Sequence, residues 1–536
     1  MNSLSERPQS GQIFQPSDST QNIDLFVEIR DLLLQDVSNQ NTKYCCVLYE
    51  KMRFNKNDNS FVWSEVDKTH PSGSIMTQFF GQQLQIQYSF EKNQELKFEI
   101  QDIQTCETLA YIETTLAKIM GSKYCILQQN LESKAIENQS GVIIIKAEQK
   151  LSNENKDWDL ILKIAGRNLA TTTTCLICAN NQPFFEITKT NLFDKSVIQK
   201  VYHSDIADDT LNPVYSPFKI TGQQLCNSDR NLPLIFDFYS RVGIDNVYLG
   251  SCSITVNEMI DRKEFTLKNR YTNSDAGVMS IYTFKLTEKP SFIEYLKSGW
   301  QIGMQIGIDF TDSNGDQTEE ESLHILTQFN QYEQAISSIC SRMQYYDEKQ
   351  QFPVFGFGAV PTFMNQTTRS DCFPLNGQES QPEINGVHNI LRIYRENLSQ
   401  IKFSQYSSVA PILQKIIEKI KDQIEEQKYT LVLIMVASEI DDLKRVQELI
   451  CQCAYLPVSI IIIGMSDEKL SCLKHLNTEK SIIRDSRGNP LTRECIQTLK
   501  FSKCLKVNGQ DLFEQAIKEI PNQFIQYMVD KEIQPA

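Results

Sequence analysis

Short stretches of alternating apolar and polar residues fill the first 290 positions of the chain. Between positions 23 and 29, Ile23, Leu25, Val27 and Ile29 fall on one face of an extended chain, because successive side chains of a strand point to opposite faces. The stretches "LQIQYSF" from position 84, "LKFEIQDI" from position 96 and "GVIIIKAE" from position 141 repeat this period. Short strands separated by turns predict an all-β sandwich over residues 21–150.

The same pattern then starts again. In "WDLILKIAG" the residues Trp158, Leu160, Leu162 and Ile164 share one face, and "QPFFEITKT", "PLIFDFYS" and "MSIYTFKL" follow. A second β-sandwich is therefore predicted over residues 155–289, in tandem with the first. Residues 1–20 are rich in Ser, Gln and Pro, and this composition predicts a disordered N-terminus.

After position 290 the period changes from that of strands to that of helices alternating with strands. A helical spacing begins near position 409 and involves Ile412, Leu413, Ile416, Ile417, Ile420 and Ile424. Between such helices lie the apolar stretches "IGMQIGIDF", "FPVFGFGA", "YTLVLIMVA" and "LPVSIIIIG". Strands that are apolar on both faces indicate a parallel sheet covered by helices on both sides. Residues 290–530 are thus predicted to form a doubly wound α/β domain.

The first of these apolar stretches ends in a polar motif. Asp309, Thr311 and Ser313 carry oxygen at every second position just past the carboxyl end of a predicted central strand. Ligands bind at this edge of open α/β sheets, and carboxylate and hydroxyl oxygens suit a hard cation such as Mg²⁺. An EF-hand is excluded because its sixth position requires Gly and is Asn314 here. A metal site and a plain polar turn both remain possible.

Composition narrows the class of protein. The formal net charge is -14, which argues against general nucleic-acid binding. The 15 cysteines are scattered and the first twenty residues lack an apolar core, so we expect free thiols in a reducing cytosol. The longest apolar runs are too short to span a bilayer, so any membrane contact is expected to be peripheral. No catalytic motif is present, and we expect no enzyme activity and no small-molecule substrate.

The order of these parts resembles the copine family, in which two C2 domains precede a von Willebrand A-like, integrin I-like domain. The resemblance covers about 500 residues and is carried by "IDFTDSNGD", "FPVFGFGA", "VAPILQKI", "LPVSIIIIG", "ILRIYRENL" and "IPNQFIQYM" in the last part. In the second sandwich it is carried by "LNPVYSPFKI" and "DNVYLG". It implies calcium-dependent binding of the C2 pair to anionic phospholipid and recruitment of protein partners by the A-like domain.

The sequence departs from the family pattern in the calcium loops. A C2 domain gathers about five Asp carboxylates around two or three Ca²⁺ ions. Here Asp36 and Asp102 match ligand positions in the first sandwich, and Asp237 and Asp245 match them in the second. Tyr239 stands where a further Asp is expected. Two carboxylates in each sandwich predict weak calcium binding.

The metal loops of the A-like domain are altered as well. The resemblance implies three loops, of which the first holds Asp309, Thr311 and Ser313. The second loop offers Ser407 or Ser408, and the third has Ala437 where a carboxylate is expected. Asp441 and Asp442 follow at a predicted helix start, where carboxylates have a capping role. A magnesium or manganese site and a vestigial polar turn stay open as alternatives.

Three lysines in the second sandwich, Lys189, Lys195 and Lys200, form a basic set. In C2 domains a lysine-rich strand in this region contacts phosphoinositide headgroups, which the resemblance extends to this chain. The alternative is an ordinary solvated strand face.

The preferred hypothesis is a cytoplasmic adaptor, recruited peripherally to the plasma membrane or other anionic membranes. It would bind phospholipid through weakened calcium sites and recruit protein partners. The alternative is a protein-interaction scaffold of the same fold that responds to neither metal nor lipid.

Overall fold

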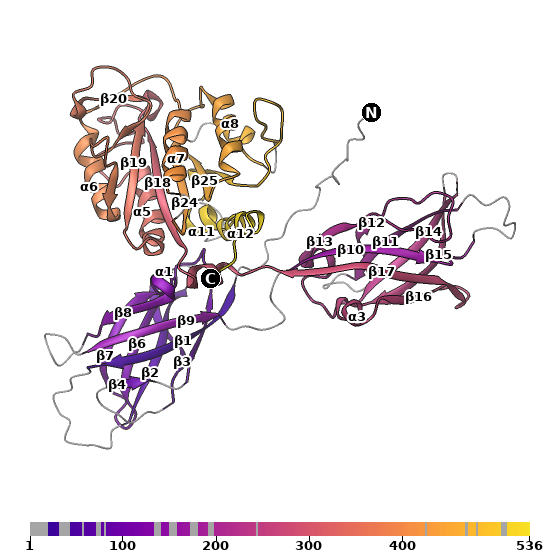
Figure 1. The fold of residues 1–536 in the computed structure, drawn as a ribbon. Coiled ribbons are helices and arrows are strands. Elements are labelled where there is room, and N and C mark those ends of the chain that lie inside the picture. Colours follow the sequence, from indigo (N-terminus) through magenta and orange to yellow (C-terminus); the bar gives the residue numbers. More distant parts are fainter. Residues whose placement is uncertain are drawn as a thin grey trace. The chain divides into compact units, whose positions relative to one another are not determined.

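The computed structural model describes residues 20–31, 43–55, 58–70, 77–79, 82–132, 141–149, 158–171, 181–190, 198–242, 245–423, 426–466, 470–478, 481–504 and 512–535. The chain divides into two compact units. One contains Met1–Lys150 together with Phe292–Ala536, and the other is Leu151–Ser291. The first unit holds a β-sandwich and an α/β domain, and the second is a β-sandwich (Figure 1).

Two antiparallel sheets form the first sandwich. One sheet contains β1 (Gln21–Arg30), β4 (Thr77–Phe79), β5 (Leu84–Tyr88), β8 (Ile126–Asn130) and β9 (Val142–Gln149); the other contains β2 (Tyr44–Asn55), β3 (Asp58–Lys68), β6 (Glu95–Asp102) and β7 (Thr108–Thr115). The four apolar residues Ile23, Leu25, Val27 and Ile29 of β1 are at most 1% exposed, while the residues between them are half-buried. The predicted one-sided alternation of β1 is confirmed.

The first sandwich and the α/β domain share one hydrophobic core. The ring of Phe90 lies 4.9 Å from that of Phe292 and 5.1 Å from that of Tyr346. The hydroxyls of Tyr88 and Tyr346 are hydrogen-bonded at 2.8 Å. All four side chains are at most 3% exposed. This apolar contact joins residues more than 200 positions apart, which explains why both parts belong to one unit.

The second sandwich is an eight-stranded antiparallel arrangement. Its strand order is β12 (Ile198–His203), β11 (Gln182–Thr190), β14 (Leu234–Val242), β15 (Asp245–Ile254), β16 (Glu264–Lys268), β17 (Asp275–Glu288), β10 (Trp158–Arg167) and β13 (Phe218–Thr221). The short helices α2 (Gly222–Cys226) and α3 (Val256–Asp261) connect strands. The predicted apolar face of β10, made of Trp158, Leu160, Leu162 and Ile164, is completely buried.

The α/β domain is built on a mainly parallel sheet. Its strands run in the order β21 (Phe373–Pro374), β19 (Gln351–Phe357), β18 (Gln301–Asp309), β24 (Lys428–Val436), β25 (Val458–Gly464) and β26 (Ile496–Lys500), with β22 (Glu383–Asn385) paired to β19. Strand β18 is parallel to both β19 and β24. It therefore lies inside the sheet, and its last residue reaches the carboxyl-terminal edge.

Both faces of this sheet are covered by helices. In β24, Leu431, Leu433 and Met435 join the core that includes α5 (Gln331–Met343) and α6 (Gly386–Leu398). The intervening residues of β24 join a second core with α7 (Ala410–Asp422) and α8 (Leu443–Cys453). The predicted parallel sheet, apolar on both faces, is confirmed.

The predicted helix near position 409 is α7, and five of the six residues proposed for its apolar face are buried. The sixth, Ile424, lies outside the described residues. The remaining helices of the domain are α4 (Phe292–Lys297), α9 (Cys472–His475), α10 (Phe501–Cys504), α11 (Leu512–Ile517) and α12 (Ile520–Asp530). Across the described ranges, every helix falls short of the length and apolarity that a membrane crossing requires.

A buried arginine ties several elements of the α/β domain together. Arg493 is 3% exposed, and its guanidinium donates to backbone carbonyls at the end of α8, at the start of β25 and within α12. The last carbonyls of a helix have no partner within the helix, and the helix dipole makes its carboxyl end favourable for a cation. One side chain thus satisfies buried acceptors from three elements.

We expect Arg493→Met to destabilise this part of the domain by about 3 kcal/mol, because several buried carbonyls lose their donor at once. Amide hydrogen exchange of β25 measures the free energy of local opening. Arg487→Met is the control, since Arg487 is exposed. Equal protection of β25 in wild type and Arg493→Met would contradict the role assigned to this arginine.

Candidate functional site

The last residue of β18, Asp309, carries a completely buried carboxylate. Its Oδ1 accepts the backbone N–H of Thr311, and its Oδ2 accepts that of Ala437, both at 2.8 Å. Ala437 follows β24, the neighbouring strand. Burial raises the pKa of Asp309, and the two N–H groups counteract this effect. The carboxylate therefore joins the ends of two central strands and starts the Asp309 loop (residues 309–316).

A neutral histidine is hydrogen-bonded to the backbone at the start of this loop. Nε2 of His324 lies 2.8 Å from the carbonyl oxygen of Asp309, which can only accept, so Nε2 carries the proton. Nδ1 then accepts the hydroxyl proton of Tyr394 at 2.7 Å. The imidazole stacks between the rings of Phe310 and Tyr332 at 4.9 and 4.2 Å. Burial lowers the pKa of His324 to about 3, which keeps it uncharged at neutral pH.

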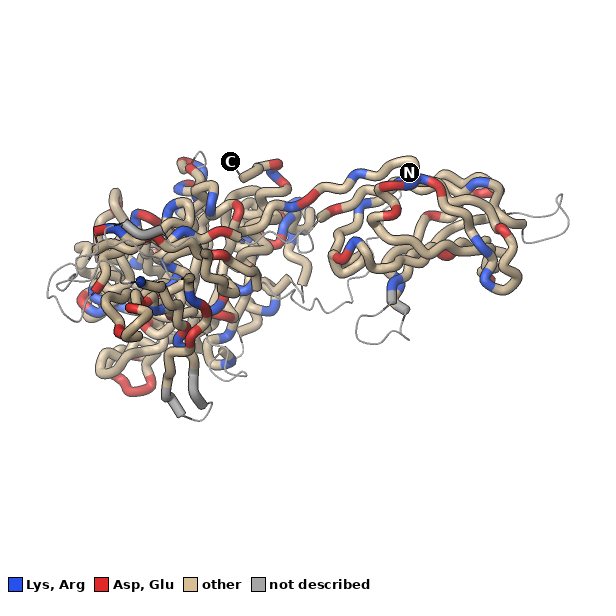
Figure 2. Tube along the Cα trace, turned by 90° about the horizontal axis from the view of Figure 1, so that it is seen from below, with Lys and Arg blue, Asp and Glu red and all other residues tan. Residues whose placement is uncertain are grey.

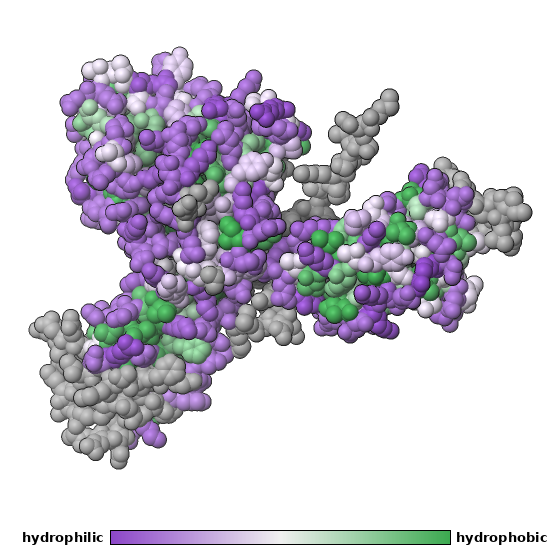
Figure 3. Space-filling model, in the orientation of Figure 1, coloured by the Kyte–Doolittle hydropathy of each residue, from purple (hydrophilic) through white to green (hydrophobic). Residues whose placement is uncertain are grey.

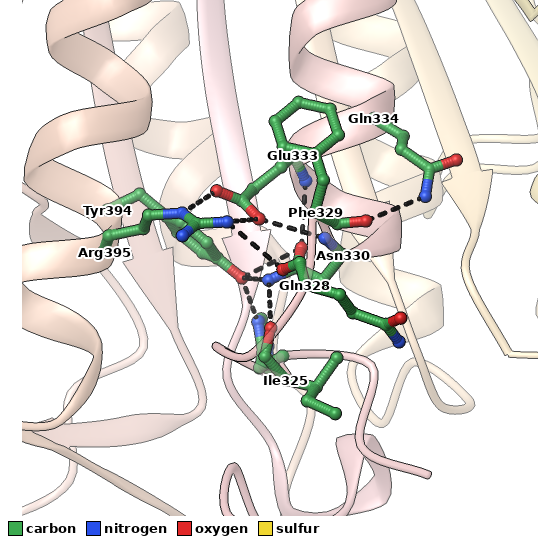
Figure 4. A network of polar contacts seen from close by, with 9 residues as sticks. Ile325, Gln328, Phe329, Asn330, Glu333, Gln334, Tyr394 and Arg395 are labelled. Carbon is green, nitrogen blue, oxygen red and sulfur yellow. Dashed lines mark hydrogen bonds and ion pairs between the residues drawn. The ribbon is translucent and has the colours of Figure 1, made fainter. Parts of the chain in front are cut away.

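Tyr394, which is bonded to this histidine, belongs to a network of polar contacts between helices α5 and α6 (Figure 4). The carboxamide of Asn330 donates to the Tyr394 hydroxyl at 3.2 Å. Asn330 and Glu333 cap α5 reciprocally, each accepting the other's backbone N–H at 3.0 Å. Arg395 of α6 donates to Glu333 at 2.8 Å. The geometry of the Asp309 loop is thereby fixed by two helices.

Asn314 completes the support from within the loop. Its Nδ2 donates to the carbonyls of Asp309 and Thr311 at 3.2 and 2.9 Å, and its Oδ1 accepts the Tyr332 hydroxyl at 2.7 Å. A short polar side chain that bonds nearby backbone holds a turn in one conformation. The loop is thus held by hydrogen bonds from its own Asn314.

The four predicted hydroxyl ligands differ in availability. Thr311 and Ser407 are at most 1% exposed, and within the described residues their hydroxyl oxygens have no hydrogen-bond partner. Ser408 donates its hydroxyl to Asp442 at 2.7 Å. Ser313 is exposed to solvent. A buried hydroxyl without a partner is unfavourable, so Thr311 and Ser407 are the two that a ligand would satisfy.

The loops that carry these two hydroxyls run side by side. Thr311 pairs with Ser404 as an isolated parallel bridge, and Asp312 donates its N–H to the carbonyl of Ser404 at 2.9 Å. Between the loops lies Gly358, where a Cβ would sit 2.5 Å from Thr311 Cγ2 and 3.1 Å from the carbonyl oxygen of Tyr406. Glycine at this position permits the close approach. That the carboxylate of Asp309 lies close to the hydroxyl of Ser407 or Ser408 stays a prediction.

The acidic residues of the loop after β24 accept hydrogen bonds from backbone N–H groups and, in the part of the chain that the structure describes, do not bond to the Asp309 loop. Glu439 accepts backbone N–H groups at the start of α9, and Asp441 accepts the N–H of Ser407 at 2.7 Å. Asp442 accepts from the first N–H groups of α7 at 2.9 and 3.0 Å. The side chain of Asp442 therefore caps α7 instead of the helix that follows it in the sequence, which corrects the expected capping role. These three carboxylates hold loops and helix starts in place.

The oxygen ligands at the Asp309 loop are of the types that a hard cation prefers. One carboxylate, Asp309, and two unpartnered hydroxyls, Thr311 and Ser407, are the oxygen ligands that Mg²⁺ and Mn²⁺ take in proteins. Ala437 supplies none, and its N–H is bonded to Asp309. Throughout the described ranges, His, Cys, Asp and Glu side chains form no cluster of three or more that could hold a metal. Any cation here would be held mainly by neutral ligands and water.

Of the two predicted calcium ligands of the first sandwich, the structure describes one. Asp36 lies outside the described residues. Asp102 ends β6, and its Oδ1 accepts the N–H groups of Gln104 and Thr105 at 2.7 and 3.3 Å. This contact is typical of an Asx turn, so Asp102 shapes the loop after β6.

In the second sandwich, Asp237 does not lie in a loop. It is in the middle of β14, paired with Glu186 of β11 and Ser251 of β15, and it is 8% exposed. Burial raises the pKa of Asp237. Asp245 is exposed at the start of β15, opposite Val242. The expectation of Asp237 as a loop residue is corrected, because β14 continues five residues beyond it.

The basic set of the second sandwich is also revised. Lys189 is 4% exposed, and its ammonium donates to Gln224 O at 2.8 Å and Asn227 Oδ1 at 2.9 Å. The prediction that Lys189 contacts lipid is wrong, because its side chain is held inside the sandwich. Lys200 is exposed and paired with Glu186 at 2.5 Å. Lys195 lies outside the described residues.

The order of parts agrees with the predicted fold class. Two β-sandwiches precede a mainly parallel α/β domain, with a polar loop at the carboxyl end of its central strand. The profile of the copine family matches residues 322–536. This match covers the C-terminal part of the chain and leaves the two β-sandwiches and the Asp309 loop outside it.

Several solved structures have a low overall similarity to this chain. The domain named BON1-C2B has a TM-score of 0.22 at 11% identity and covers 26% of this chain and 97% of that chain. The calcium-bound pair of C2 domains of extended synaptotagmin 2 has a TM-score of 0.20 at 13% identity, covering 51% and 99%. The manganese-loaded TRAP protein of Plasmodium vivax has a TM-score of 0.25 at 13% identity, covering 38% and 70%.

The sequence analysis did not predict the buried residues that hold the Asp309 loop in place. His324, Tyr332 and Tyr394 lie 15 to 85 positions away from Asp309 and carry no local motif. The role of Asn314 could have been predicted from the sequence, because the side chain of an Asn in a loop commonly bonds nearby backbone groups.

We expect Ala437→Asp to create a site for Mg²⁺ or Mn²⁺, because it adds a second carboxylate beside Asp309 and the free hydroxyls of Thr311 and Ser407. Calorimetric titration with Mn²⁺ should show binding that is at least about tenfold tighter than in wild type. Ser438→Asp, one position further along the same loop, is the matched control. Equal gains in both variants, or tight binding by wild type that Ala437→Asp leaves unchanged, would contradict the assignment of the loop.

Proposed function

We propose that this chain is a copine-type peripheral membrane adaptor without catalytic activity. Its two C2-like sandwiches bind anionic phospholipid surfaces, and its copine domain recruits protein partners. The observation that carries this proposal is the combination of two tandem β-sandwiches with a copine domain in one chain. The adaptor is expected in the cytoplasm and, when recruited, at the plasma membrane or another anionic membrane.

The calcium response of this adaptor is weak in our proposal. A multi-calcium site needs several carboxylates, because about six to eight oxygen ligands surround each ion. Of the carboxylates predicted as calcium ligands, Asp102 is engaged in a turn and Asp245 is exposed at the start of β15. Calcium affinity is therefore placed near the weak end of the range of about 10⁻⁷ to 10⁻³ M known for protein sites.

Partner recruitment is assigned to the edge of the copine domain around the Asp309 loop. The hydroxyls of Thr311 and Ser407 are buried and unpartnered within the described residues, so a bound cation or a polar group of a partner would relieve their cost. Magnesium or manganese at this place would present an open coordination position to a partner's carboxylate.

A scaffold that responds to neither lipid nor metal is the second candidate. It is favoured by the burial of Lys189 and by the pairing of Lys200 with Glu186, which leave little free positive charge on this part of the sheet. Figure 2 shows Lys and Arg interspersed with Asp and Glu over both units. Membrane attraction by charge alone adds only about 1 kcal/mol for each basic residue near the surface.

We expect the full chain to co-sediment with vesicles of phosphatidylcholine and phosphatidylserine, and not with vesicles of phosphatidylcholine alone. Binding should decrease as salt rises, because the Debye length falls from about 10 Å at 0.1 M to about 3 Å at 1 M. Adding millimolar calcium should increase the bound fraction only modestly relative to a chelator. Absence of binding to anionic vesicles in every condition would reject the adaptor and favour the scaffold.

Lys200→Gln should weaken vesicle binding by about fivefold or less, the equivalent of about 1 kcal/mol for one basic residue. Lys285→Gln, on β17 of the same sandwich, is the matched control. A larger loss in the control would show that the face carrying Lys200 is not the one that contacts lipid.

A further inference from the structure

A surface cavity of about 320 Å³ lies beside the Asp309 loop, at the start of α5. The N–H of Leu323, on its wall, donates to the carbonyl of Asn314 in the loop at 2.9 Å. The hydroxyl of Ser322, also on the wall, donates to the carbonyl of Gly315 at 3.1 Å. Ligand pockets have volumes of about 300–1,000 Å³, so this cavity suits a single side chain better than a large ligand. Its lining combines apolar, amide and acidic side chains, among them Glu320, Glu321, Leu323, Phe329, Gln334 and Phe501.

The ring of Phe329 is the exposed apolar part of this cavity. Among the phenylalanines that the structure describes in the α/β domain, Phe329 alone is exposed, at 49%. Hydrophilic residues predominate on the face of this domain seen in Figure 3. The carbonyl oxygen of Phe329 accepts the side-chain amide of Gln334 at 3.0 Å (Figure 4). The backbone of Phe329 is thus held in place, while its ring is open to a ligand.

The chain around the cavity is acidic. From position 298 to position 341 the sequence contains seven Asp and Glu residues and no Lys or Arg. Two of the seven, Glu320 and Glu321, are exposed and line the cavity. Their carboxylates make no hydrogen bond or ion pair with any residue that the structure describes. The charge of the nearby Arg395, which donates to the carbonyl of Gln328 at 3.1 Å, is paired with Glu333. A positively charged ligand is therefore favoured.

The start of α5 does not require the carboxylates of Glu320 and Glu321. A helix N-terminus favours negative charge nearby, so acidic residues there can have a purely structural role. In α5 this role belongs to Glu333, which accepts the N–H of Asn330 in the reciprocal cap. Glu320 and Glu321 remain available to a ligand.

An arginine side chain matches all of these features together. Its planar guanidinium has several N–H donors and no acceptor, and it binds carboxylates in a fork geometry. A guanidinium is also attracted to the face of an aromatic ring, and its aliphatic stem packs on apolar surface. The ammonium group of lysine is more strongly hydrated and lacks the fork.

We propose that this cavity binds an arginine side chain of a protein partner, with the guanidinium held by Glu320 and Glu321 and lying against Phe329. This inference rests on the proposed recruitment of protein partners, and it names the chemistry by which one partner is recognised. Because the wall of the cavity is bonded to the Asp309 loop, the partner segment lies next to that loop.

Two short peptides that differ in one charge test this inference on the full chain. One is acetyl-Ala-Leu-Arg-Leu-Ala-amide, and the other has citrulline, which keeps the shape of arginine without its charge. Saturation-transfer NMR should show binding of the arginine peptide and binding at least about tenfold weaker of the citrulline peptide, because bonds to charged groups are the stronger ones. Glu320→Gln combined with Glu321→Gln should abolish this difference. Phe329→Ala should weaken binding of the arginine peptide by about fivefold or less.

Two control variants change exposed residues that do not line the cavity. Glu426→Gln removes a carboxylate just before β24, and Tyr455→Ala removes a ring that is 56% exposed, just after α8. Both variants should bind the arginine peptide as wild type does. A peptide with glutamate in place of arginine should not bind to wild type.

Equal binding of the arginine and citrulline peptides by wild type would overturn the inference. Absence of binding at millimolar peptide, or a preference for the glutamate peptide, would do the same. Vesicle co-sedimentation is a separate measurement. A chain that binds anionic vesicles and not the arginine peptide would keep the proposed membrane function and lose this site. Selective binding of the arginine peptide without vesicle binding would favour the scaffold and leave the inference standing.

Discussion

The carboxylate of Asp309 is the constraint on which the carboxyl-terminal edge of the α/β sheet depends. A buried charge is costly unless its oxygens are bonded, and here two backbone N–H groups from neighbouring strands bond them. Because this bonding joins the ends of β18 and β24, the loops that follow both strands start from fixed positions. The neutral His324 and the carboxamide of Asn314 then hold the first loop from its inner side.

The same principle recurs over the described parts of both units: charges are satisfied by groups of the chain itself. Asp441 and Asp442 bind backbone amides of the loop and helix beside them, and Arg493 binds carbonyls from three elements. In the second sandwich Lys189 is held by a carbonyl and an amide. In such a chain, hydrogen bonds to groups of the chain itself hold the loops in place.

Periodicity was sufficient to predict the three folded parts, since buried faces of strands and helices repeat at fixed intervals. It predicted the buried face of β10 and five of the six apolar residues proposed for α7, and the sixth, Ile424, lies outside the described residues. The strand stretches "QPFFEITKT" and "PLIFDFYS" already placed Lys189 on the same face as Phe185 and Ile187 and Asp237 in mid-strand. The resemblance to C2 domains instead assigned Lys189 to a lipid-binding face and Asp237 to a calcium loop. The supporting role of His324 depends on tertiary contacts between distant segments, and no local pattern in the sequence reports them.

The shared core between the first sandwich and the α/β domain makes the second sandwich an insertion. The chain leaves one compact unit after Lys150 and returns to it at Phe292, while Phe90, Phe292 and Tyr346 close the core without it. A single proteolytic cut between the first and second sandwiches would then leave the fragments associated through that core. Replacing the second sandwich by a short linker would, for the same reason, yield a smaller protein with an intact interior.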